Sequence, residues 1–99
     1  MNIAGEHYGS ALGSASAGGH KNVVQMLLEN GADVNIAGRY YGSALVSASD
    51  GGHKKVVQIL LENGADVNIA GGDYGSALGS ASAEGHKEIV QMLDRKSVV

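Results

Sequence analysis

The stretch "GHKNVVQMLLENGADVN", residues 19–35, decides the fold because it recurs at a constant spacing. It returns as "GHKKVVQILLENGADVN" at residues 52–68, and a shortened version, "GHKEIVQMLDRKS", stands at residues 85–97. The spacing is 52 − 19 = 33 and then 85 − 52 = 33 residues. Such a period indicates supersecondary units that stack on one another.

Each copy of this stretch predicts one amphipathic helix followed by a turn. Val23, Val24, Leu27 and Leu28 recur at helical spacing and form one wide apolar stripe. The pair Asn-Gly that follows, at residues 30–31, is a helix stop. The next residues, "ADVNIAGRYYG", are rich in turn formers, so they predict an extended connection with a hairpin-like tip.

A second, shorter helix is predicted ahead of the first one in each unit. "SALGSASA", residues 10–17, consists of small residues and leucine, which lets a neighbouring helix approach closely. Ser10 is expected to N-cap this helix. Gly18 and Gly19 are expected to end it, with a residue at positive φ after the last turn.

Taken together, these units resemble ankyrin repeats in their period, their Gly-His step, their Val/Leu helix and their "GADVN" tail. The resemblance implies an all-α ankyrin repeat solenoid: a single array over residues 1–99, with three helix-turn-helix units and hairpin-like tips. The repeats are expected at about 5–37, 38–70 and 71–99, the last one truncated. Ala11 stands where the family has proline, and the "YGSAL" dialect at residues 8–12 resembles arrays in fungal proteins.

The glycine-rich run "YGSALGSASAGGHK", residues 8–21, is not a phosphate-binding loop. Gly13 and Gly18 have the spacing of that motif, but Gly19 and His20 occupy the places of its lysine and its serine or threonine. No serine lies in a G-x-S-x-G context, and the carboxylates fall mostly at equivalent repeat positions. We therefore expect no enzyme activity and no cofactor.

Three histidines, His20, His53 and His86, occupy one repeat position, which raises the alternative of a metal site. Packed helices lie about 10 Å apart, whereas the ligand nitrogens of zinc must lie within about 2.1 Å of the ion. We therefore expect no metal. The resemblance implies that these histidines begin the second helices and hydrogen-bond neighbouring loops.

Composition narrows the partner classes. The net charge is −3, which does not supply the basic face of a nucleic-acid binder, so no nucleic acid is expected. No apolar run approaches the ~20 residues of a membrane helix, so no membrane is expected. The absence of cysteine suits an intracellular protein, in the cytoplasm or the nucleus.

The positions that differ between repeats are the candidate partner-binding residues. By their offset from the "SAL" motif they match the hairpin tips and first-helix positions through which ankyrin proteins contact partners. The candidates are Glu6, His7, Arg39, Tyr40, Asp50, Asp73 and Glu84. The resemblance thus implies a non-catalytic module that binds an unidentified protein. Neutral drift on solvated positions is the alternative, because Asn22, Lys55 and Glu88 differ as well.

The ends of the array suggest a second function. Val23 and Met26 of the first unit look like those of an internal copy, without the polar face that a terminal repeat needs. The alternative is a structural segment of a longer ankyrin array, such as the repeat region of a fungal nucleotide-binding signalling protein, without its own binding site. The chain is expected to be a monomer, or to stack end to end if its ends are uncapped.

Overall fold

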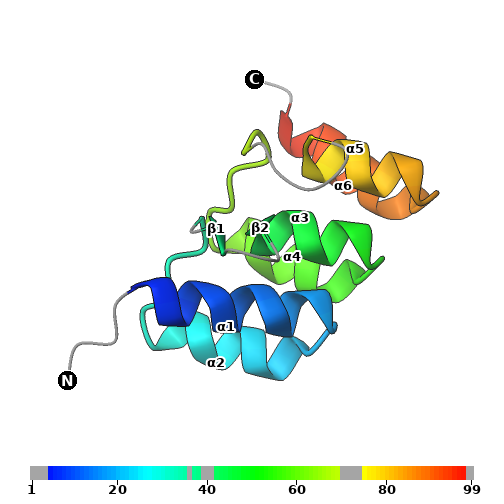
Figure 1. Ribbon diagram of the computed structural model, residues 1–99. Helices are drawn as coiled ribbons and strands as arrows, with labels where there is room; N and C mark the ends of the chain where they lie inside the picture. The colour runs from blue at the N-terminus through cyan, green and yellow to red at the C-terminus, as the bar shows by residue number, and fades with distance from the viewer. Residues whose placement is uncertain (1–4, 36, 39–41, 70–74, 98–99) are drawn as a thin grey trace.

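The computed structural model describes residues 5–35, 37–38, 42–69 and 75–97, and within them it shows three stacked pairs of antiparallel helices (Figure 1). The first helix of each unit is short, except for α1 in the first unit, and the second helix packs beside it. The array is elongated and measures 41 × 26 × 23 Å. The elements are α1 (Gly5–Ala17), α2 (Lys21–Glu29), β1 (Ala37–Gly38), β2 (Gly42–Ser43), α3 (Ala44–Asp50), α4 (Lys54–Glu62), α5 (Ala77–Ala83) and α6 (Lys87–Ser97).

The second helices form and end where the repeated stretch predicts. Asn30 and Asn63 follow α2 and α4, and each side-chain Nδ2 donates 2.8 Å to a carbonyl of the last turn. Gly31 and Gly64 come next at φ +93° and +88°, a conformation that costs glycine nothing. The Asn-Gly stop is therefore confirmed in both complete copies.

The first helices differ in where they begin. Ser43 and Ser76 N-cap α3 and α5: their hydroxyls accept the backbone N–H of Val46 at 3.2 Å and of Gly79 at 3.0 Å. The equivalent prediction for Ser10 is wrong, because α1 begins at Gly5 and Ser10 lies inside it. The backbone is extended at Ser43, which belongs to β2, and at Ser76, whereas Ser10 lies in a helix that has already begun five residues earlier and gains one hydrogen bond per added residue.

The connection between the first and second units contains the predicted hairpin-like tip. Ala37 pairs with Ser43 and Gly38 with Gly42 in an antiparallel ladder of two residues on each strand. Ahead of it, Asn35 joins two successive tails: its Oδ1 accepts the N–H of Asp66 at 2.7 Å, and its Nδ2 donates to the Gly64 carbonyl at 3.3 Å. The "GADVN" tail therefore ties neighbouring units together.

One apolar core runs through the three units, as stacking requires. Helix α1 packs on α3 and α3 on α5, while α2 packs on α4 and α4 on α6. The small first helices approach so closely that the hydroxyls of Ser16 and Ser49 are buried without a hydrogen-bond partner. The side chains in the centre of the core are almost fully buried: Leu12, Val24, Leu45, Val57, Leu60 and Leu93.

Candidate partner-binding surface

Five of the seven predicted contact residues have side chains that the structure does not describe. Arg39 and Tyr40 fall between β1 and β2 in the chain, and they and Asp73 lie outside the described residues. Glu6 and His7 belong to the first turn of α1, and their side chains lie outside the description as well. The contact role of these five residues stays a prediction.

Two other predicted contact residues lie at the opposite end of the first helices. Asp50 is the last residue of α3 and Glu84 is the C-cap of α5, so both occupy turns between a first and a second helix, and both side chains are exposed. A seven-residue helix is about 10 Å long and separates these turns from the hairpin end. The structure thus brings Asp50 and Glu84 to one edge and does not join them to the tips.

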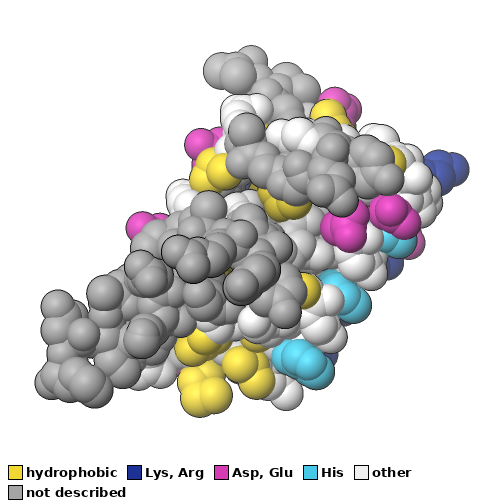
Figure 2. Space-filling model, viewed as in Figure 1, with side chains coloured by type: hydrophobic (Ala, Val, Ile, Leu, Met, Phe, Trp, Pro, Cys, Tyr) yellow, Lys and Arg dark blue, Asp and Glu magenta, His cyan; other side chains and the backbone are white. Residues whose placement is uncertain are grey.

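Histidine side chains lie along this edge (Figure 2, cyan), and two of them hydrogen-bond the turns of the preceding units. The Nε2 atom of His53 lies 2.9 Å from the carbonyl oxygen of Ala17, and that of His86 lies 3.0 Å from the carbonyl oxygen of Asp50. Because a carbonyl only accepts, Nε2 carries the proton in each ring. The predicted structural role of His53 and His86 is confirmed, since each one clamps the turn of the preceding unit.

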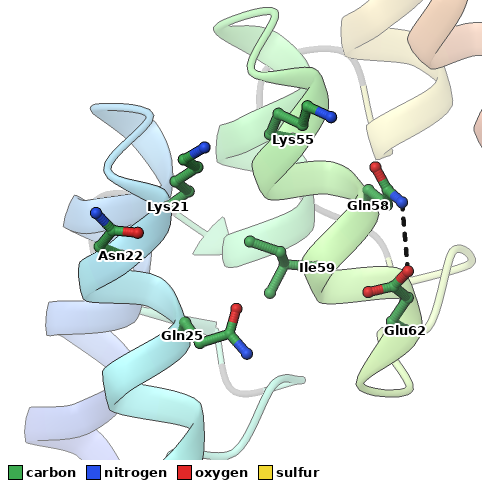
Figure 3. A pocket seen from close by; sticks show the side chains of 7 residues that line it. All are labelled: Lys21, Asn22, Gln25, Lys55, Gln58, Ile59 and Glu62. Carbon is green, nitrogen blue, oxygen red and sulfur yellow. Dashed lines mark hydrogen bonds between the residues drawn. The ribbon is translucent and has the colours of Figure 1, made fainter.

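A groove between α2 and α4 was not anticipated from the sequence. It has a volume of about 310 Å³ and lies between the outer surfaces of the second helices (Figure 3). We call it the Lys21–Lys55 groove. Its lining is polar apart from one isoleucine: Lys21, Asn22, Gln25, Lys55, Gln58, Ile59 and Glu62.

A second groove lies between α4 and α6, and both members of an ion pair line it. It measures about 410 Å³, and the Nζ atom of Lys54 lies 2.9 Å from Oε2 of Glu88 across it. The sequence signal for both grooves was the variation at Asn22, Lys55 and Glu88, which occupy one repeat position. This variation changes the charge between neighbouring second helices. It therefore marks the grooves, although from the sequence alone it is indistinguishable from drift at solvated positions.

No arrangement in the described part of the chain points to metal or membrane chemistry. Among residues 5–35, 37–38, 42–69 and 75–97, no three histidine, cysteine, aspartate or glutamate side chains lie together as a metal site would need. None of the described helices is long and apolar enough to span a bilayer.

Comparison with known proteins agrees with this architecture. A family model described as ankyrin repeats in three copies matches residues 2–71. The chain is also similar to the azaphilone pigments biosynthesis cluster protein L of Monascus ruber, with 59% identity over 34 residues. That match covers 34% of this chain and only 7% of the relative. The chain belongs to the ankyrin repeat family.

Proposed function

We propose that this chain is an intracellular, non-catalytic module that binds a protein partner through its hairpin tips and the exposed ends of its first helices. Ankyrin repeats generally mediate protein–protein interaction. The observation that carries the proposal is the contrast between two kinds of position. Stacking positions such as Ala48 and Ala81 are identical and fully buried, whereas the varied positions Asp50 and Glu84 are exposed. A packed frame that presents varied residues at exposed positions suits partner recognition.

Replacing Arg39 and Tyr40 together with alanine is expected to weaken partner binding without unfolding the array. Arginine and tyrosine are enriched among residues whose truncation costs most at interfaces, about 2 kcal/mol or more, so we expect at least a thirtyfold loss of affinity. The partner is first recovered by affinity capture, and its affinity is then measured by calorimetry with both purified proteins. Gln91→Ala, an exposed change on α6, is the control. Unchanged affinity in the double variant would mean that the tips are not the contact surface.

A second candidate function, stacking on another ankyrin array, is favoured by the open face of the first unit. Val23 is 41% exposed and Met26 53%, whereas Val56, which is equivalent to Val23, is 1% exposed under the preceding unit. His20 makes no hydrogen bond with a described residue of the kind that His53 and His86 make. At the other end Leu78 and Val90 are only half-buried, while the equivalents Leu45 and Val57 are buried. The two end faces are thus copies of an interface that the chain already forms internally.

If the two end faces stack in this way, the chain will associate head to tail in solution. We expect a mass above the 10.0 kDa monomer that rises with concentration, measured by light scattering after size exclusion. Val23→Glu combined with Met26→Glu places charges on the face and should return the mass to the monomer. Gln58→Glu adds a charge on the exposed side of α4 and should not. A wild-type mass of 10.0 kDa at all concentrations would exclude stacking between copies.

A further inference from the structure

The Lys21–Lys55 groove holds two like charges at the place where the neighbouring groove holds an ion pair. A shift of one repeat relates the two pairs, since 54 − 33 = 21 and 88 − 33 = 55. In the α4–α6 groove these two positions are Lys54 and Glu88, whose charged atoms lie 2.9 Å apart. The side chains at these positions can therefore meet across a groove. Between α2 and α4 both of them are cations, and neither makes a described ion pair.

The groove lining favours an anion at one end only (Figure 3). Lys21, Gln25 and Ile59 reach into the gap between the helices, whereas the Lys55 ammonium is directed away from Lys21, as expected for like charges. The first turns of α2 and α4 add positive potential at the lysine end through the helix dipole. At the other end lies Glu62, which accepts a hydrogen bond from Gln58 at 3.3 Å and is negative.

We infer that the Lys21–Lys55 groove binds a side-chain carboxylate from an acidic segment of a partner protein. The carboxylate lies between the two ammonium groups, takes the place that Glu88 fills beside Lys54, and draws Lys55 toward Lys21 through its flexible stem. Of the predicted contact residues whose side chains the structure describes, Asp50 and Glu84, neither lines this groove. The inference rests on side chains of the second helices and not on the proposed tip surface.

The chemistry of the groove favours a peptide carboxylate over a nucleic-acid backbone. The ligand that satisfies the same lysine position in the neighbouring groove is a glutamate. Among the described lining residues only two are cations, amide groups of Gln25 and Gln58 flank them, and Glu62 lies at the far end. The whole chain carries a net charge of −3, which repels a nucleic-acid backbone. One carboxylate of an acidic segment, set between the two ammonium groups, fits this pattern of charge.

In the first test the full chain is titrated with an end-blocked octaglutamate peptide. Binding is monitored through the amide NMR shifts at about 20 mM salt, where screening is weak. We expect the shifts to gather on the first turns of α2 and α4. Lys55→Glu supplies an internal partner for Lys21, as Glu88 does for Lys54, and should lower the affinity by about tenfold. Lys96→Glu changes the net charge equally on α6, away from both grooves, and should lower the affinity by less than about twofold.

A gain of binding provides the second test. Glu88→Lys turns the α4–α6 groove into a second pair of lysines, so new shifts should arise on the first turns of α4 and α6. Glu29→Lys changes the charge equally at the end of α2 and should add no site. Circular dichroism verifies that each variant is folded. Equal effects of each groove variant and its control, shifts centred elsewhere, or no binding by the wild-type chain would overturn the inference.

Discussion

Replacing Leu60 with alanine is expected to remove a large part of the stability of the whole chain, although the change removes one side chain from one of the three units. Leu60 lies on α4 in the central unit and is 0% exposed. Truncating a fully buried leucine costs about 2–5 kcal/mol, from lost burial and from the cavity that remains. Whole domains are stable by only about 5–15 kcal/mol, and a domain of this size stands at the lower end.

The repeat supplies a matched control for Leu60. Leu27 occupies the same position in the first unit, but it is only half-buried there because no described unit covers that side. We expect Leu27→Ala to cost less than half as much as Leu60→Ala. The measurement is urea unfolding followed by far-UV circular dichroism, with the midpoint and slope of each transition compared. Equal costs at the two positions would contradict stacking as the source of stability, because the two leucines share their helix and their repeat position.

Much of the fold could be predicted because local signals and stacking agree in this chain. The apolar stripe, the Asn-Gly stops and the glycines at positive φ each specify one element, and the structure has them where the pattern puts them. The start of α1 could not be predicted from the motif, because the same "YGS" triplet that precedes α3 and α5 lies inside a helix in the first unit. The two states differ in the backbone of the serine, which is extended at Ser43 and Ser76 and helical at Ser10, and the triplet alone does not specify it.

The surface was harder to predict than the fold, because charge pairing between repeats joins residues that are 34 positions apart. In the sequence, Asn22, Lys55 and Glu88 resemble drifting solvated positions. The roles of Lys55 and Glu88 depend on the lysine of the preceding unit, Lys21 or Lys54, which lines the same groove. The partner of a residue in a stacked array must be sought in the next repeat. Asp50 shows the same rule, since its carbonyl is held by His86.

Replacing Gly52 with alanine is expected to destabilise the array more than the same change at Gly64. Gly52 has φ +77°, and an added Cβ atom would lie 2.7 Å from Cε1 of His86. Gly64 in the same unit has φ +88°, and nothing lies within 4 Å of its Cβ position. Gly64→Ala therefore measures the backbone cost alone, about 1–2 kcal/mol.

The additional cost at Gly52 comes from the His86 ring, which hydrogen-bonds the carbonyl of Asp50 in the same turn. The new methyl group must push the His86 ring off the turn, which breaks the 3.0 Å bond to the Asp50 carbonyl and loses about 0.5–1.5 kcal/mol. His86→Ala removes both the ring and the clash. In that background Gly52→Ala should cost no more than Gly64→Ala does in the wild-type chain, a non-additivity that a double-mutant cycle measures by urea unfolding. If the cost of Gly52→Ala is the same with and without His86, the ring does not restrict this turn, and the glycine is required by its backbone conformation alone.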